Sequence, residues 1–230
     1  MKDISFDIQV GQFVIIFGPS GCGKSTLLHT LLGLERPDTG SVKIFDKDMY
    51  KDPTGEEASN IRMKEIGMVY QQAYWVKSLN VEENTALPLR ILGIEKDIRS
   101  LKTKEVLSSV MMLDWAKYHP SELSSGQQQM VSLSRALITN PRLIIADEPT
   151  GNLDSETGTK LIKMLKSINE DGITIVMVTH DLEYLEYADM CIKLRNGQVE
   201  KIFSPEVDVE EMRTINMKKK LYEKISAKNL

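Results

Sequence analysis

The sequence predicts an α/β fold with a parallel central sheet, antiparallel strands beside it and an inserted helical subdomain. Three observations favour this fold. Several short runs are apolar throughout, as strands covered on both faces are, and helical patterns separate them. A glycine-rich turn joins the first of these runs to a helix. Between residues 80 and 140 the strand pattern disappears, and apolar residues recur at helical spacing.

The expected parallel strands are short apolar runs that helical segments separate. They occupy residues 13–17, 66–70, 143–146 and 173–178. After the first run come the glycine-rich turn and a helix that carries leucines on one side, at positions 27, 28, 31 and 32. Because strands alternate with helices along the chain, a parallel sheet is the expected arrangement.

Antiparallel strands are expected at both ends of this core. Residues 3–8 alternate polar and apolar side chains, which predicts a one-sided antiparallel strand. Residues 191–194 and 199–203 alternate in the same way, and Asn196-Gly197 lies between them. An Asn-Gly pair is typical of a tight hairpin turn, so these two segments are expected to pair with each other.

The central helical region is expected to form a subdomain, about residues 75–140, inserted between two strands of the core. Asn80 with Glu83 three residues later resembles a capped helix start, and apolar residues keep a helical spacing through Leu113. The core domain, including this insertion, is expected to span residues 1–203.

A helical tail is expected over residues 204–230. Ser204-Pro205 resembles an N-cap followed by proline at the first helical position. Met217, Leu221 and Ile225 lie four residues apart and would line one face. The tail carries acids early and lysines late, so it could pack on its own domain or approach anionic lipid headgroups.

Composition limits the classes of function. With 29 Lys and Arg against 33 Asp and Glu, the formal net charge is -4, which argues against a nucleic-acid binder that works through bulk positive charge. No apolar run approaches the ~18 residues that cross a bilayer, and the N-terminus has no apolar signal core. Two cysteines make no disulfide framework. We therefore expect a cytoplasmic protein whose membrane contact is made mainly through a partner.

The glycine-rich turn, Gly18 to Ser25, fits the pattern G-x-x-x-x-G-K-[ST] between a strand and a helix. Glycines let backbone N–H groups curl around phosphates, and the helix N-terminus adds partial positive charge. Lys24 is expected on the β- and γ-phosphates, and the Ser25 hydroxyl on Mg²⁺. The predicted nucleotide-binding residues here are Gly18, Pro19, Ser20, Gly21, Cys22, Gly23, Lys24, Ser25 and Thr26.

Two adjacent acids end a later apolar run, residues 143–146. Asp147 is expected to hold Mg²⁺, directly or through water. Glu148, one residue further, is placed to orient and deprotonate an attacking water. A solvated acidic loop is the alternative for this pair taken alone. Together with the phosphate loop, the Asp147–Glu148 pair predicts a magnesium-dependent nucleotide hydrolase.

Other motifs narrow the class of hydrolase. Leu123-Ser124-Ser125-Gly126-Gln127, 20 residues before Asp147, resembles the LSGGQ signature of ATP-binding cassette (ABC) ATPases, a class of P-loop NTPases. Gln71 follows the expected strand 66–70, where that family carries its Q-loop glutamine. Residues 148–154 resemble the catalytic glutamate and D-loop, and His180 resembles the switch histidine. Residues 147–155 are most similar to the branch of macrolide exporters, lipoprotein-releasing complexes and the cell-division ABC complex.

The resemblance implies how such a protein works. Two copies would form an ATP-dependent, head-to-tail dimer with two ATP molecules between them. One copy would supply the phosphate loop and the catalytic residues, Glu148, His180 and Gln71. Gln71 would also lie near Mg²⁺, with Ser25 and Asp147. The remaining ATP contacts would come from Ser124, Gly126, Gln127 and Asp154, the signature residues belonging to the other copy. The partner would be a membrane permease, with the chain peripheral at the inner face of the cell membrane.

Three departures from the family pattern bear on this expectation. Ser125 stands where the signature usually has glycine, which would cost energy if the backbone has a positive φ. Met130 stands where the branch usually has arginine. The family also carries an adenine-stacking aromatic residue on a strand well before the phosphate loop, whereas 23 residues precede Lys24. Either the chain is a truncated product or the base is held differently.

Two other functions remain open at this point. A soluble ABC ATPase of DNA repair or translation control usually carries coiled-coil insertions, zinc modules or tandem cassettes, and none of these is visible here. A regulatory module that binds ATP without turnover would not need Glu148, His180 and Asp154, which are all present. The transporter motor is therefore the expected function.

Overall fold

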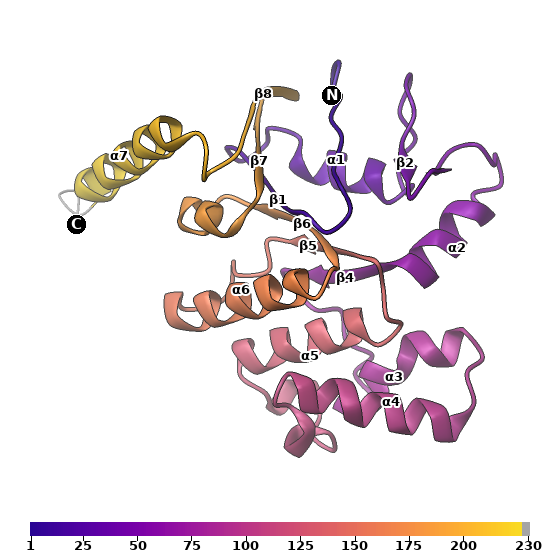
Figure 1. The fold of residues 1–230 in the computed structure, drawn as a ribbon. Helices are drawn as coiled ribbons and strands as arrows, with labels where there is room; N and C mark the ends of the chain where they lie inside the picture. The colour runs from indigo at the N-terminus through magenta and orange to yellow at the C-terminus, as the bar shows by residue number, and fades with distance from the viewer. Residues whose placement is uncertain (227–230) are drawn as a thin grey trace.

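The computed structural model describes residues 1–226, and in its last helix the side chains of residue 216 and of residues 219–226 lie outside the description. A six-stranded sheet forms the centre, in the order β4-β5-β6-β1-β7-β8 (Figure 1). The strands are β1 (Phe13–Phe17), β4 (Ile66–Tyr70), β5 (Leu143–Asp147), β6 (Thr174–Thr179), β7 (Met190–Arg195) and β8 (Gln198–Phe203). The α/β fold predicted from the sequence is confirmed.

The first five strands of that order are parallel, and β8 runs antiparallel to β7. Asn196 and Gly197, between β7 and β8, have φ of 50° and 75°. Left-handed backbone at both central residues is the geometry that an Asn-Gly hairpin turn requires, so the predicted hairpin is confirmed. Because β7 also pairs with β1, this hairpin extends the parallel sheet.

Helices cover both faces of the sheet (Figure 1). On one side lie α1 (Lys24–Leu31) and α2 (Glu56–Glu65), and on the other α5 (Ser125–Leu137) and α6 (Ser155–Glu170). The helices α3 (Val81–Ile91) and α4 (Lys96–Ser109) pack outside α5 and come between β4 and β5 in the chain. Short 3-10 turns are η1 (Leu113–Trp115), η2 (Pro120–Glu122) and η3 (Leu182–Tyr187).

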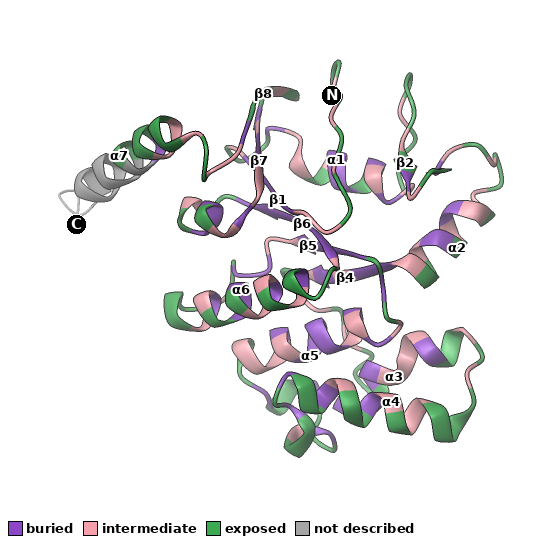
Figure 2. Ribbon diagram, in the orientation of Figure 1, coloured by how far each residue is buried: buried purple, intermediate pink, exposed green. Residues whose placement is uncertain are grey.

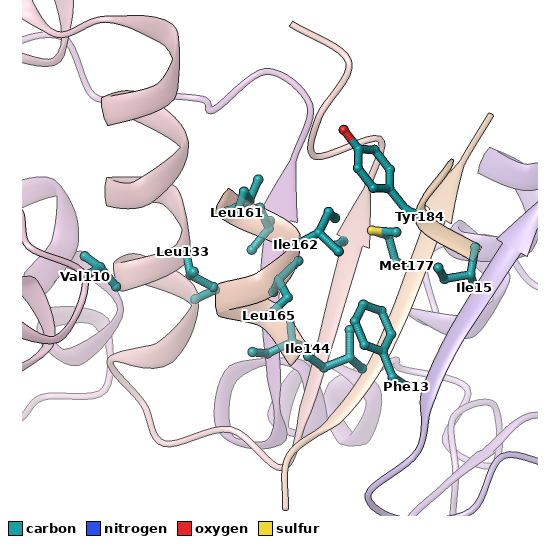
Figure 3. Packing of buried hydrophobic residues seen from close by; sticks show 14 of the residues in the cluster. Phe13, Ile15, Val110, Leu133, Ile144, Leu161, Ile162, Leu165, Met177 and Tyr184 are labelled. Atoms are coloured by element: carbon teal, nitrogen blue, oxygen red, sulfur yellow. The ribbon is translucent and has the colours of Figure 1, made fainter. Parts of the chain in front are cut away.

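Two apolar clusters form the core, one on each face of the sheet. Alternate residues of β1 serve the two clusters, because successive strand side chains point to opposite faces. Phe13 and Ile15 join the α6 residues Leu161 and Leu165, as Figure 3 shows, whereas Val14 joins the α1 leucines. All of β1 is therefore buried (Figure 2).

The strand predicted over residues 3–8 is wrong. The alternation is real, since Ile4, Phe6 and Ile8 are half-buried and pack on the cluster beside α1. The segment has no strand assignment, however, and Asp3 has a left-handed φ of 50°. Burial of one side of an extended segment produces the same alternation as a strand, but a strand also needs a neighbour for its backbone hydrogen bonds.

A small antiparallel sheet escaped prediction. It consists of β2 (Lys43–Ile44) and β3 (Lys47–Asp48). Phe45 and Asp46 connect them with φ of 49° and 66°, so the turn is left-handed without any glycine. Strands of two residues are too short to show a period in the sequence.

The tail helix begins later than predicted. Ser204 and Asp208 close a turn, in which the Ser204 N–H donates to Asp208 Oδ2 over 2.9 Å and the Asp208 N–H donates to the Ser204 carbonyl over 2.8 Å. Asp208 then accepts the first bond of α7 (Val209–Ser226) from the Met212 N–H. Asp208 thus precedes the helix in place of the expected serine, and its carboxylate holds the preceding turn rather than the helix N–H groups. Ile215 is buried in the core.

The apolar face predicted for the tail is only partly described. Met217 is exposed, whereas the side chains of Leu221 and Ile225 lie outside the described part of the chain. None of the helices that the structure describes is both long and apolar enough to span a bilayer.

Candidate functional site

Four predicted residues lie along one edge of the sheet. In the strand register, Tyr70 is opposite Asp147, Asp147 is opposite Val178, and Phe17 is opposite Thr179. The next residue of each chain segment leaves the sheet at its carboxyl edge, where ligands of open α/β sheets bind. Those residues are Gln71, Glu148, His180 and Gly18, in the strand order β4-β5-β6-β1.

The turn after β1 has the shape that the phosphate-loop pattern predicts. Gly21 and Gly23 have φ of 77° and 104°, a region that non-glycine residues rarely adopt. A Cβ on Gly18 would lie 2.3 Å from the Leu194 carbonyl oxygen and 2.8 Å from Cys22 Sγ, so only glycine fits. The Cys22 carbonyl accepts from the Gly197 N–H over 3.0 Å, which ties the turn to the β7–β8 hairpin.

Helix α1 begins inside this turn, with Gly23 as its N-cap. The Lys24 ammonium donates to the carbonyls of Gly18 and Pro19, over 3.0 and 3.3 Å, and so lies over the loop. Ser20 and Ser25 are exposed, and Thr26 is half-buried in the first turn. Free N–H groups of a helix start, a lysine and a hydroxyl form a good donor set for phosphate oxygens.

Asp147 is the half-buried last residue of β5. Burial raises the pKa of its carboxyl above the usual range, and the neighbouring Glu148 raises it further, whereas His29 and Lys24 act in the opposite direction. The effect of His29, a residue of α1, on the pKa of Asp147 could not be inferred from the sequence. A cation bound here would be favoured, because it would neutralise a charge that the fold disfavours.

We expect Asp147→Asn to raise the melting temperature of the protein without nucleotide at neutral pH. Because the carboxyl pKa is raised in the folded protein, ionised Asp147 destabilises the fold above that pKa. The gain should shrink as the pH falls towards the usual aspartate value, where wild type is protonated too. Asp97→Asn is the control, because Asp97 is exposed in the first turn of α4 and favours the fold. A lower melting temperature for Asp147→Asn at pH 7 would contradict the argument.

Glu148 and His180 form a hydrogen-bonded pair. Glu148 Oε2 is 2.8 Å from His180 Nδ1 and 3.2 Å from the His180 backbone N–H. An ionised carboxylate only accepts, so Nδ1 carries the hydrogen. Glu148 has a left-handed φ of 45°. Its N–H donates to the Val178 carbonyl over 2.9 Å, which holds this unusual conformation at the edge of β6.

Gln71 leaves β4 and lies against the segment that follows Glu148. A Cβ on Gly151 would be 2.6 Å from Gln71 Nε2, so the side-chain amide rests on that glycine. The Gln71 carbonyl accepts from Asn152 Nδ2 over 3.3 Å. It also accepts from the buried Gln129 Nε2 over 3.0 Å.

The signature residues lie at the start of α5, against α6. Ser124 is the N-cap of α5, with a capping box in which its hydroxyl accepts from the Gln127 N–H and its N–H donates to Gln127 Oε1. Asp154 caps α6, and its carboxylate accepts from the Thr157 N–H and the Thr157 hydroxyl, two bonds that lower the pKa of this carboxyl. Gly126 faces that same Thr157, since a Cβ there would be 2.5 Å from Thr157 Cγ2.

The structure therefore divides the predicted residues into two groups. The phosphate loop, Asp147, Glu148 and His180 meet at the sheet edge, whereas Ser124, Gly126, Gln127 and Asp154 meet at the starts of α5 and α6. The hydroxyl of Ser124 bonds within its own motif, to the Gln127 N–H. Ser125 is the first residue of α5 and its φ is not left-handed, so it carries no backbone strain.

Sequence reasoning missed Gln129 and Asn152, which bind the Gln71 segment. A signal for Gln129 was present, because Gln129, Leu133 and Ala136 recur at helical spacing and all are buried. Met130, by contrast, is half-buried and packs against the core, where the branch usually has arginine.

The residues present fit a magnesium–nucleotide complex. Gly18 lets the turn lie directly against the Leu194 carbonyl of β7, and the Lys24 ammonium lies over the turn through its bond to the Gly18 carbonyl. Mg²⁺ usually binds one or two carboxylates or hydroxyls together with substrate phosphates. Asp147 and the exposed Ser25 are of that kind, at the end of β5 and the start of α1.

Comparisons with known proteins agree with this geometry. The family described as ABC transporter matches residues 1–151. An uncharacterized ABC transporter ATP-binding protein of Methanocaldococcus jannaschii is 43% identical over 204 residues, which are 89% of this chain and 91% of that protein. The lipoprotein-releasing system ATP-binding protein LolD of Colwellia psychrerythraea is 38% identical over 200 residues, 86% of this chain and 77% of that protein.

A solved structure is similar over nearly the whole fold. It is a dimeric ATP-binding cassette of Methanocaldococcus jannaschii in a post-hydrolysis state, bound to ADP and Pi. The TM-score is 0.80 and the identity 38%, over 89% of this chain and 90% of that one.

Proposed function

Since the chain belongs to the ABC transporter ATP-binding family, we propose that it hydrolyses ATP between two copies of itself and so drives a membrane permease. The predicted branch is confirmed by the similarity to the lipoprotein-releasing protein. The observation that carries the proposal is the Glu148–His180 pair, 2.8 Å apart, beside the phosphate loop at one edge of the sheet.

Each residue of the edge has a task in hydrolysis. The turn after β1 and the first N–H groups of α1 hold the phosphates, and Lys24 neutralises the β- and γ-phosphates. Glu148 accepts a proton from the water that attacks the γ-phosphorus. His180 keeps the Glu148 carboxylate in place through two donors, its Nδ1–H and its backbone N–H. Magnesium, held by Ser25 and Asp147 near Gln71, would neutralise charge that develops on the phosphate oxygens.

A second copy would complete the site. The two groups of residues within one chain support this, because the Ser124 hydroxyl, the Gly126 N–H, Gln127 and Asp154 lie at helix starts of their own. Such helix starts are suited to anions. In the similar cassette of known structure, the protein is a dimer bound to ADP and Pi. ATP would then join the two copies, and hydrolysis would release them.

The permease would rest on the helical subdomain, proposed as residues 75–140 of a 1–203 core domain. Apolar side chains that a partner could cover are exposed on it, Ile91 at 65% and Leu101 at 60%, and directly before it, Tyr74 at 71%. The chain would then lie at the inner face of the cell membrane, attached through its partner. Co-purification with a permease would distinguish this function from that of a soluble ABC ATPase.

Complementation between two inactive variants tests the shared site. Lys24→Ala removes the phosphate lysine, and Ser124→Asp keeps an N-cap while placing a negative charge against the γ-phosphate. Each variant alone should be nearly inactive. An equal mixture should regain about a quarter of the wild-type rate, because half of the randomly formed dimers hold one intact site of two. A mixture as inactive as its parts would mean that each chain uses its own signature residues.

A further inference from the structure

Gln129 is a buried amide at a junction of three chain segments. It lies on α5 and is 3% exposed. Its Nε2 donates to the carbonyls of Tyr70, Gln71 and Pro149, each over 3.0 Å. Tyr70 is the last residue of β4 and Gln71 follows it, whereas Pro149 follows Glu148 directly. One side chain thus joins the Gln71 segment to the segment that carries Glu148.

The orientation of this amide is fixed by its surroundings. Turning it over would place Oε1 against three carbonyl oxygens, with no hydrogen between them. The amide nitrogen has two hydrogens for three acceptors, so at least one hydrogen is shared. Gln129 Oε1 has no partner within the described part of the chain. A buried polar atom without a partner costs stability, so the site is not arranged for stability alone.

The two segments that Gln129 joins also touch each other directly. Asn152 Nδ2 donates to the Gln71 carbonyl, and the Gln71 side chain rests on Gly151. The position of Gln71 therefore depends on donors from two elements. Gln129 supplies the donor from α5, and Asn152 supplies the donor from the turn before α6.

Helix α5 extends these contacts to the signature motif. Ser124 caps the helix five residues before Gln129, and α5 continues without a break to Leu137. A helix transmits displacement as a rigid element, so movement of Ser124 also moves the amide that holds Gln71. The neighbouring Gln128 makes a similar link between the signature motif and the segment after Gln71. Trp75 Nε1 donates to Gln128 Oε1, and Gln128 Nε2 donates to the Leu123 carbonyl.

We propose that Gln129 is a positioning residue for ATP hydrolysis. Its amide sets the spacing between the Gln71 segment and the segment after Glu148, and it changes that spacing when α5 moves with the signature motif. Gln71 and Glu148 at one ATP site then reach their working positions only when Ser124 of the same chain is in place against the γ-phosphate of the second site. This inference rests on the proposed ATPase function and adds a residue through which the two ATP sites of the dimer are coordinated.

Gln129→Met tests the proposal, because methionine keeps the length of the side chain and removes both donor hydrogens. We expect kcat for ATP hydrolysis to fall on the order of 10–100-fold, because small misplacements of catalytic groups have effects of this size. The Kd for MgADP should stay within about twofold, because phosphate-loop contacts are not touched. Gln129→Asn keeps an amide but withdraws it by one methylene, so it should show the same loss if Gln129→Met does not fold.

Ser132→Ala is the matched control. Ser132 lies on the same helix, is fully buried, and its hydroxyl has no partner among the described residues, so its removal breaks no bond. Its kcat should equal that of wild type. A double variant with Gln71→Ala separates positioning from a general loss of structure. If Gln129 acts through the Gln71 segment, Gln71→Ala with Gln129→Met should be no slower than Gln71→Ala alone.

Two results would overturn the inference. One is a folded Gln129→Met or Gln129→Asn variant with kcat within twofold of wild type. The other is a loss of kcat in Gln129→Met that adds fully to the loss in Gln71→Ala, or an equal loss of kcat in Ser132→Ala. A merely structural role of Gln129 predicts both of these outcomes. A wild-type chain that does not hydrolyse ATP would instead contradict the proposed function, and the two failures are therefore distinguishable.

Discussion

Glu148→Gln is expected to slow ATP hydrolysis by about 10²–10⁴-fold, the usual contribution of a positioned general base. The amide cannot take the proton of the attacking water, but it keeps the shape of the glutamate. Its carbonyl oxygen can still accept from His180 Nδ1, the bond that spans 2.8 Å in wild type. MgATP binding should therefore persist, because the phosphate loop and Lys24 are unchanged.

The same variant should accumulate as an ATP-bound dimer in size-exclusion chromatography, since hydrolysis no longer releases the two copies. Glu156→Gln is the control, because Glu156 is an exposed acid of α6 that pairs with Lys160. It should keep the wild-type rate and remain monomeric after turnover. Normal turnover by Glu148→Gln would remove Glu148 from the proton-transfer step.

Gly18→Ala is expected to abolish nucleotide binding, with a loss of affinity of roughly 100-fold or more, equal to about 2.7 kcal/mol. The new Cβ would lie 2.3 Å from the Leu194 carbonyl oxygen, a backbone atom of β7 that cannot turn away. The turn must then shift away from β7, and its N–H groups leave the positions that hold the phosphates. Isothermal titration with MgATP and MgADP measures the loss.

Gly93→Ala controls for the general cost of removing a glycine. Gly93 has a φ of 72° between α3 and α4, and no atom lies within 4 Å of a Cβ built there. This variant should lose about 1 kcal/mol of stability through backbone strain and keep its affinity for nucleotide. If Gly18→Ala binds MgATP as wild type does, the turn after β1 is not the phosphate site.

Motif spacing predicted the sheet edge well because each motif residue directly follows a strand. A buried strand is visible in sequence as an apolar run, and a parallel register brings the ends of such strands together. Glu148, predicted from the paired acids, and Gln71 and His180, predicted from the family resemblance, therefore all lie at the same edge as the phosphate loop. The helix start at Asn80 was also predictable, because the capping box that Asn80 forms with Glu83 involves residues close together in the chain.

Contacts between distant segments were not predictable. The three carbonyls that Gln129 binds lie 59, 58 and 20 residues away in the chain, and no local pattern marks a buried amide for such partners. The strand predicted over residues 3–8 was wrong for a different reason. Burial of one side of an extended segment and pairing in a sheet produce the same alternation of polar and apolar residues. The start of α7 was misplaced because Ser204 and Asp208 are both good caps, and the turn between them decided which one begins the helix.

The left-handed backbone of Glu148 has a consequence for how this sequence can evolve. A non-glycine residue at a φ of 45° costs of order 1–3 kcal/mol, which a glycine at the same position would not cost. Selection for thermal stability alone would therefore favour replacement of Glu148 by glycine. Drift would also lead to loss of the carboxylate if selection for activity were relaxed. On the proposed function, a descendant that retains the fold and binds nucleotide without turning it over is one substitution away, and glutamate persists here only while turnover itself is selected.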